Sequence, residues 1–371
     1  MNRSQIQRRE RYLLREGLRE FTRVERQEDC GTSTVDSPVI LLRKGMDGWT
    51  ASLRSVSMCT RLTCPVCAPV MWSRVAWDLT LGIGAWQAAG NSVALVELRM
   101  LVCDRDSFES RWQAVHAGWS EVRGNRKQQR RRMQVLGLVG YHARPELVHQ
   151  LRFGWQPRLR ALMFLAGTDH VEGRFAKRLE AAIQPAWSHG VIAAGQRVPP
   201  PRSRVDIEVI GTHRNAGAEA VARYLASGAP TGIEPSGGPP RTLWQVLSDA
   251  CNHHRPAQVA WQGLERELQV RGRRLRSPSQ HLHQRLGLTA KSEPVADPLE
   301  QRVAVLDPAD WYDRPRRLGL GHHATEMLEL VEDAKRGGFD PFDRLASWLQ
   351  SRGAHPPQRP SQHPAKDHYR G

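Results

Sequence analysis

The pattern of hydrophobic and polar positions predicts a chain in which helices and strands alternate. Over residues 1–26, Arg and Glu alternate around apolar side chains at helical spacing. A second, apolar helix is expected to end at Gly90, and the run SVALVELRMLVC at 92–103 is typical of a strand. Residues 107–122 again have the helical period, with one apolar side made of Phe108, Trp112, Val115 and Trp119.

Further elements in the middle of the chain determine the expected fold class. Strands are predicted at 135–148, 159–165 and 205–210, and helices at 171–187 and 216–227. The order between residues 92 and 227 is therefore βαββαβα. This order favours an antiparallel sheet with helices on one face, an α+β palm, over a doubly wound parallel sheet.

Changes in composition divide the chain into five expected segments. The linker GAPTGIEPSGGPP ends the core near residue 240, and the Pro- and His-rich polar tail is expected to be disordered. The regions beyond the core have mainly helical periodicity. The segments are a charged N-terminal helix at 1–29, a cysteine-rich segment and helix at 30–90, the palm at 91–240, a helical C-terminal extension at 241–352 and the tail at 353–371.

Composition adds a strong positive charge to this picture. The 371 residues include 54 basic and 38 acidic side chains, which gives a net charge of +16, and only six of the basic residues are Lys. Guanidinium groups suit bidentate phosphate contacts, so the surplus points to nucleic acid as a partner. GC-rich coding would explain the excess of Arg over Lys, but it would not explain the excess of base over acid.

No segment has the pattern of a membrane span or a secretory signal. The longest uncharged run, 79–96, is interrupted by polar residues and glycines, and the first ten residues contain no apolar core. No basic amphipathic anchor stands out either, so an anionic membrane surface is the weaker explanation of the charge. We therefore expect a cytoplasmic protein without a membrane partner.

Four of the six cysteines fall within 38 residues, as Cys30 followed by Cys59-x4-Cys64-x2-Cys67. A C-x2-C pair with two further cysteines suits a tetrahedral structural zinc site. Such an ion would hold the segment before the core sheet in its folded conformation and would not take part in catalysis. The alternative is that these are ordinary buried thiols, which is the interpretation we favour for Cys103 and Cys251.

Several motifs then follow one another along the chain. They are CTRLTCPVCA at 59–68, NSVALVELRM at 91–100, the helix with Trp112 and Trp119, GYHARPE at 140–146, GWQPRLRAL at 154–162, VARYLAS at 221–227 and the Arg-rich segment 261–288. In this order and spacing they resemble the rolling-circle replication initiators (Rep) of bacterial plasmids, which belong to the HUH endonuclease superfamily. The resemblance covers roughly residues 29–290.

The resemblance implies a fold, a chemistry and partners. In this family two histidines flanking one apolar residue project from a strand to the same face and, with a neighbouring carboxylate, hold Mg²⁺ or Mn²⁺. The cation polarises a DNA phosphate while a tyrosine attacks it, which leaves a 5′-phosphotyrosyl link and a free 3′-OH. The implied partners are single- and double-stranded plasmid origin DNA, a host helicase and a single-strand-binding protein.

This chain departs from the family at the metal motif. Gln156, Arg158 and Arg160 stand where the three histidines of the signature belong. Guanidinium has no free lone pair and cannot coordinate a metal, although it can hold a DNA phosphate. The position of the nicking tyrosine is filled by Tyr224, but the lysine three residues later is replaced by Ser227.

Nearby residues offer partial substitutes for the missing ligands. Glu146 stands at the carboxylate position, and an ion pair with Arg158 or Arg160 is its alternative role. Strand alternation puts His142 on the face of Glu146 and turns His149 to the other face. A rebuilt metal site from these histidines is the less favoured interpretation.

Two further features are candidates for DNA contact. The run RGNRKQQRRR at 123–132 ends in Arg130, Arg131 and Arg132, whose alternative role is that of a solvated charged loop. Trp155, beside the altered motif, is a candidate platform for base stacking. Three functions remain open: a divergent nickase acting through Tyr224, a DNA-binding relative without catalysis, and an RNA-binding protein built on the same palm.

Overall fold

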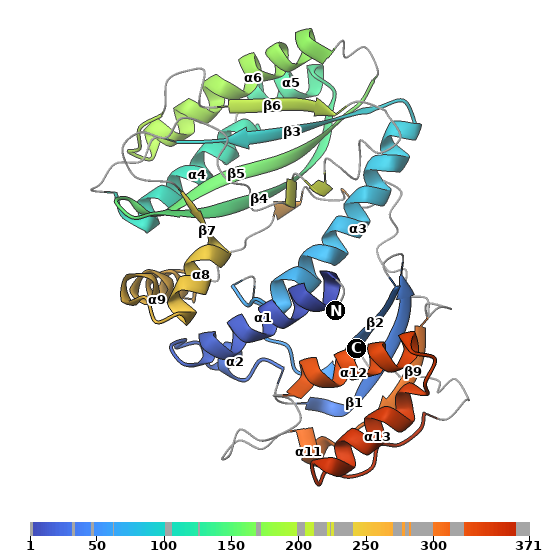
Figure 1. The fold of residues 1–371 in the computed structure, drawn as a ribbon. Coiled ribbons are helices and arrows are strands. Elements are labelled where there is room, and N and C mark those ends of the chain that lie inside the picture. Colours follow the sequence, from blue (N-terminus) through green and yellow to red (C-terminus); the bar gives the residue numbers. More distant parts are fainter. Residues whose placement is uncertain are drawn as a thin grey trace. The chain divides into compact units, whose positions relative to one another are not determined.

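The computed structural model divides the chain into two compact units, one of residues 1–68 with 292–371 and the other of residues 69–291 (Figure 1). Each unit is described by itself. The residues that the structure describes are 3–31, 34–45, 48–61, 63–100, 106–124, 127–167, 172–198, 205–210, 221–222, 224–225, 240–269, 277–278, 282, 300–311 and 323–360.

The second unit is built on a six-stranded antiparallel sheet in the order β6-β3-β5-β4-β7, with β8 also paired to β4. The central strand β5 is buried along almost its whole length, which matches its run of large apolar residues. The strands are β3 (Ser92–Leu98), β4 (Leu138–Gln150), β5 (Gly154–Leu165), β6 (Val205–Ile210), β7 (Arg241–Thr242) and β8 (Ser277–Pro278).

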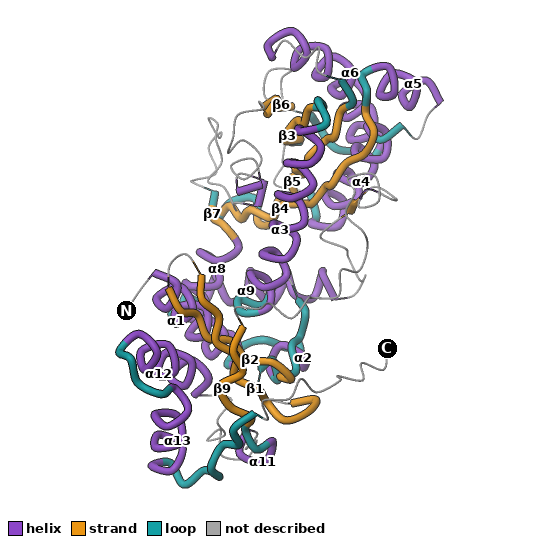
Figure 2. The backbone as a smooth tube through the Cα atoms, turned by 90° about the vertical axis from the view of Figure 1, so that its right-hand side faces the viewer, coloured by secondary structure: helices purple, strands orange, loops and turns teal. Residues whose placement is uncertain are grey.

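Helices α4 (Phe108–Val122) and α6 (Glu172–Ala193) cover one face of this sheet (Figure 2). Their apolar sides pack on the side chains of Val96, Ala143 and Ala161. The two helices approach closely because Gly118 of α4 and Gly190 of α6 have no side chains at the crossing, where a Cβ on Gly190 would lie 2.6 Å from a backbone oxygen of α4. This layer is the main core of the unit.

The other face of the sheet carries α3 (Cys67–Ala88) at one end and charged residues at the other. Leu79 and Ile83 of α3 pack against Val93, Leu162 and Phe164. This arrangement differs from the expectation of helices on one face only. The other helices of the unit whose bounds lie among the described residues are α5 (Lys127–Val135), α8 (Leu243–Cys251) and α9 (Arg255–Gln269).

The first unit has a three-stranded antiparallel sheet in the order β2-β1-β9, packed against α12 and α13. A buried ion pair between Arg8 and Glu332 ties the N-terminal helix to α12. The elements are α1 (Arg3–Arg19), α2 (Glu25–Glu28), β1 (Thr34–Gly45), β2 (Gly48–Val56), β9 (Glu300–Val305), α11 (Pro308–Trp311), α12 (Ala324–Arg336) and α13 (Pro341–Ser351).

The α+β class with an antiparallel sheet is confirmed, and the elements from β3 to β6 follow the predicted order apart from the additional helix α5. Three features differ from the expectations. The basic run forms helix α5 rather than a loop, the cysteine-rich segment contains the β1–β2 hairpin, and the region expected to be helical beyond residue 241 contributes strand β9.

The chain ends also differ from the expected division. Gln358, in the segment expected to be a disordered tail, pairs with Val305 of β9. Of the helix expected at 216–227, only residues 221–222 and 224–225 lie within the described residues, and Ser227 and Cys103 lie outside them. Among the described residues, no helix is both long enough and apolar enough to cross a bilayer.

Candidate functional site

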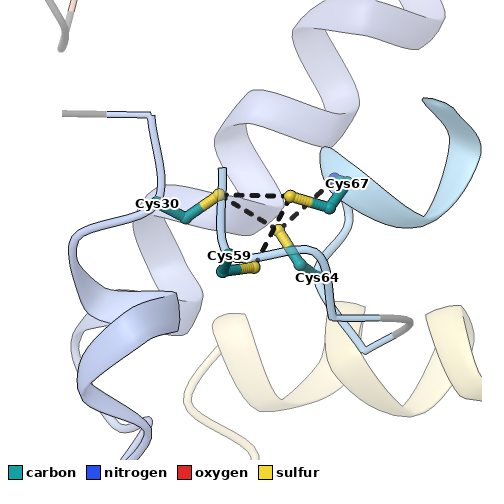
Figure 3. A group of neighbouring side chains, drawn as sticks. All are labelled: Cys30, Cys59, Cys64 and Cys67. Carbon is teal, nitrogen blue, oxygen red and sulfur yellow. Dashed lines mark hydrogen bonds between the residues drawn. The ribbon is translucent and has the colours of Figure 1, made fainter. Parts of the chain in front are cut away.

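The four predicted zinc ligands meet in one buried cluster in the first unit (Figure 3). Cys30 follows α2, Cys59 follows β2, and Cys64 and Cys67 lie at the start of α3. The Sγ atom of Cys30 lies 3.7 Å from that of Cys64 and 3.4 Å from that of Cys67, and all four sulfurs lie within 4.8 Å of one another. Cys30 and Cys59 are far apart in sequence but lie close together, because the β1–β2 hairpin brings its two ends together.

This geometry suits a tetrahedral metal ion. Zinc bound by four thiolates at about 2.3 Å holds the sulfurs about 3.8 Å apart. None of the four thiols forms a disulfide, for which sulfur atoms must come within about 2.05 Å of each other. The cluster can therefore hold a metal such as zinc, and it is the one group of three or more potential ligands found among the described residues.

Neighbouring groups support the cluster from two sides. The backbone N–H of Cys67 donates to the Sγ atom of Cys64, an arrangement produced by the first turn of α3. Arg19 donates to the carbonyl oxygen of Cys30 at 2.8 Å, so its positive charge lies beside the thiols. Hydrogen bonds from the other three thiols, first among them Cys59, lower the pKa of Cys30, and hydrogen bonds with Cys30 raise the pKa of Cys59 and of Cys67.

The residues at the altered family motif lie on the charged face of the sheet. Glu146 of β4 stands directly opposite Arg158 of β5, while Arg160 stands between Arg144 of β4 and Glu97 of β3. Directly opposed residues of antiparallel strands project to the same face. The expected alternation of β4 is thus confirmed, and these five side chains share one face.

Ion pairs join these side chains into a network. The Nε atom of Arg160 lies 3.2 Å from a carboxylate oxygen of Glu146, and its Nη2 atom lies 3.5 Å from Glu97. Burial raises the pKa of Glu146, and the nearby guanidinium groups oppose that shift only in part. At Glu97 burial acts in the same direction, but Arg99 and Arg160 outweigh it and hold the pKa below its usual value. The ion pair predicted for Glu146 is confirmed with Arg160.

Tyr224 is enclosed at the same face rather than presented to a substrate. It has 0% exposure, and its hydroxyl lies 2.7 Å from Nδ1 of His142. The guanidinium of Arg144 stacks over its ring and over the ring of Trp72. Burial raises the pKa of Tyr224 above its usual value near 10, so the phenol is a poor nucleophile at neutral pH.

The remaining predicted residues of the motif have other roles. Gln156 is buried on the charged face, where its amide donates to the side chain of Gln150. Trp155 projects to the opposite face, is buried, and donates its indole N–H to the carbonyl oxygen of Ala260 at 2.8 Å. His149 projects to that opposite face as well, directly across from Trp155.

The basic run gives the most accessible charged surface among the predicted sites. Arg130, Arg131 and Arg132 are exposed on α5, whose inner side is anchored by Met133 in the core. Arg131 and Arg132 line an open pocket of about 700 Å³ together with Arg178 of α6. In the described part of the chain none of these pocket arginines has an ion-pair partner. Arg178 was not identified from the sequence, because its approach to α5 depends on the packing of two helices.

Comparisons of the chain with known protein families, with curated proteins and with solved structures find no match. The function is therefore inferred from the geometry of these residues.

Proposed function

We propose that this protein binds DNA as a relative of the plasmid rolling-circle replication initiators and has lost their metal-dependent nicking. The observation that carries the DNA-binding proposal is the open pocket between α5 and α6, where Arg131, Arg132 and Arg178 are exposed. Unpaired guanidinium groups on neighbouring helices suit successive phosphates of a backbone. The net charge of +16 adds long-range attraction to the same partner.

The charged face of the sheet supports the loss of nicking. A divalent cation there would have to displace Arg160 from between Glu97 and Glu146, and it would find guanidinium groups instead of imidazoles. The candidate nucleophile Tyr224 is buried and bonded to His142. Both requirements of the family reaction are therefore missing from the described residues.

We further propose that the metal held by the four cysteines is zinc. An all-thiolate, tetrahedral and fully buried set leaves no open position for a substrate, which is typical of structural rather than catalytic zinc. Its role would be to fix α2 and the ends of the β1–β2 hairpin to the start of α3. Mg²⁺ and Mn²⁺ prefer oxygen ligands and have no place in this cluster.

The DNA-binding proposal is tested by replacing Arg131, Arg132 and Arg178 together with Ala. Because each phosphate contact contributes about −0.9 to the slope of log affinity against log salt, we expect the slope to become shallower by about 2 to 3. The measurement is fluorescence anisotropy of a labelled duplex over a series of salt concentrations.

The matched control is a triple Ala variant at Arg23, Arg54 and Arg344, which are exposed and lie outside this pocket. It removes the same formal charge, so a loss of general attraction would affect both variants equally. Equal slopes for the two triple variants would contradict the proposal. Tighter binding of an RNA competitor of the same length would favour the RNA-binding alternative.

A further inference from the structure

A second cavity of the palm unit lies on the face of the sheet opposite the charged network. Its volume is about 470 Å³, and it opens between the start of α4, the β4–β5 turn and α9. Its wall combines aromatic and aliphatic side chains with the charged side chains of Asp106, Arg111, Arg266 and Glu267. The lining residues that matter here are Phe108, His149, Phe153, Trp155, Gly263 and Arg266.

The polar floor of the cavity contains an unsatisfied group. His149 is 8% exposed, and its Nδ1 atom has no hydrogen-bond partner. Buried polar atoms of proteins are almost always paired, so the ring of His149 keeps unused hydrogen-bonding capacity beside the cavity, although its Nδ1 atom is itself enclosed. The indole N–H of Trp155 is already used on Ala260, so the polar side chains of the lining besides it are His149, Asp106, Arg111, Arg266 and Glu267.

The walls of the cavity are fixed before any ligand binds. Buried Arg111 donates to the carbonyl oxygens of Phe153 and Trp155, which holds the β4–β5 turn in place. The ring of His149 packs edge-on against Trp155, with centroids 5.0 Å apart. A preformed aromatic wall lowers the entropic cost of binding a flat ring.

Charge at the cavity changes from its floor to its rim. Burial, with a further contribution from Arg241, lowers the pKa of His149 to about 4, so the imidazole is neutral at pH 7. A neutral imidazole exchanges a hydrogen bond with an uncharged ring edge instead of attracting an anion. Exposed Arg266 supplies positive charge for a phosphate, and the carboxylates of Asp106 and Glu267 line the cavity as well.

We propose that this cavity binds one unpaired nucleotide, with its base against the aromatic wall and His149, and its phosphate at Arg266. A base has a flat apolar face and a polar edge, which are the two features that this cavity offers, and its volume admits a nucleotide. A base inside a duplex cannot enter, so the cavity gives a preference for single strands. The inference rests on the proposed nucleic-acid binding and adds that the bound nucleic acid is single-stranded at this cavity.

The test blocks the cavity at Gly263 of α9. A Cβ at this position would meet no atom within 4 Å, so Gly263→Leu extends into the cavity without a backbone clash. Anisotropy with a labelled 12-nucleotide oligo(dT) should show a loss of affinity of about tenfold, because stacking and hydrogen bonding of one base are lost. Affinity for a 12-base-pair duplex should stay within about twofold of wild type.

Two further variants make the result decisive. Gly84→Leu is the matched control, because Gly84 also lies in a helix with open space around its Cβ, and it should change neither affinity. His149→Phe keeps the size of the ring but removes the hydrogen bond, and it should weaken oligo(dT) binding alone. Thermal melting of each variant checks that the fold is retained.

The outcomes separate this inference from the proposed function. Unchanged oligo(dT) affinity in Gly263→Leu, or an equal loss with oligo(dT) and duplex, would overturn the cavity while duplex binding through α5 and α6 stands. Titration with dTMP, followed by tryptophan fluorescence, distinguishes the source of the nucleotide. If dTMP quenches the fluorescence of wild type but not that of Gly263→Leu, the cavity also binds free nucleotides. If dTMP causes no quenching while Gly263→Leu still weakens oligo(dT) binding, the cavity binds only nucleotides within a strand.

Discussion

Arg160 determines what the charged face of the sheet can bind. Its guanidinium lies between Glu97 and Glu146, the only carboxylates near the altered motif among the described residues of β3, β4 and β5. In a buried setting these charges are stable only while they remain paired. The same side chain therefore stabilises the sheet and excludes a cation.

Replacing Arg160 with Met should strongly destabilise the protein. The substitution keeps the length of the side chain but leaves Glu97 and Glu146 without their shared partner, so we expect a loss of about 3 to 5 kcal/mol in the free energy of unfolding. Urea denaturation at pH 7 measures it. Arg344→Met, at an exposed position of α13, should change stability by less than about 0.5 kcal/mol. A loss below about 1 kcal/mol for Arg160→Met would contradict this description of the network.

Some site residues could be predicted from the sequence because their spacing alone determines which side chains can lie close together. The cysteines were identified from the C-x2-C pair, and the shared face of His142 and Glu146 follows from strand alternation. The bond between His142 and Tyr224 could not be predicted, because it depends on how a distant segment packs on the sheet. The role of His149 was missed for the same reason, since α9 supplies the opposite wall of its cavity.

At the scale of elements, the contact between α4 and α6 determines how the two helices pack on the sheet of the second unit. Gly118 and Gly190 allow the two helices to approach, and Trp187 packs into the space beside Gly118. The apolar sides of both helices then reach the sheet. The helical period predicted each helix by itself, but it did not show that the glycines lie where the helices cross.

Placing a methyl group at this crossing should separate the helices. Gly190→Ala brings a Cβ within 2.6 Å of the carbonyl oxygen of Ala117, so we expect destabilisation despite the better helix propensity of Ala. We expect Gly84→Ala, at an open helical position, to gain up to about 1 kcal/mol. Thermal unfolding of both variants gives the comparison. A stabilised Gly190→Ala would show that the crossing tolerates a side chain.

Strands β3, β4, β5 and β6 were predictable because each contains apolar residues in a run or in alternation, whereas the two-residue strands β7 and β8 were not predicted. The β1–β2 hairpin was missed because the cysteines on either side of it suggested a metal-bound loop, although Val39–Leu42 is an apolar run. Strand β9 was missed because it forms only by pairing with β1, about 260 residues earlier in the chain. Contacts this distant in sequence leave no local pattern.

At the scale of the whole molecule, the first unit depends on the cysteine cluster. Protein purified under reducing conditions should carry about one zinc per chain, and a chelator should lower its melting temperature, because structural zinc contributes folding energy. Cys64→Ser should lose the metal. Cys251→Ser is the control, since Cys251 lies in α8 outside the cluster. Metal analysis that finds no zinc in wild type would contradict the assignment.

The central claim is that this protein binds plasmid DNA without cutting it, and one incubation tests both parts. Supercoiled plasmid carrying the candidate origin is mixed with the protein in Mg²⁺ or Mn²⁺, and gels are run before and after protein removal. We predict a retarded complex that releases intact supercoiled DNA, because Arg160 lies between Glu97 and Glu146 and Tyr224 is buried. Nicked circles covalently linked to the wild-type protein, and absent with Tyr224→Phe, would contradict the claim.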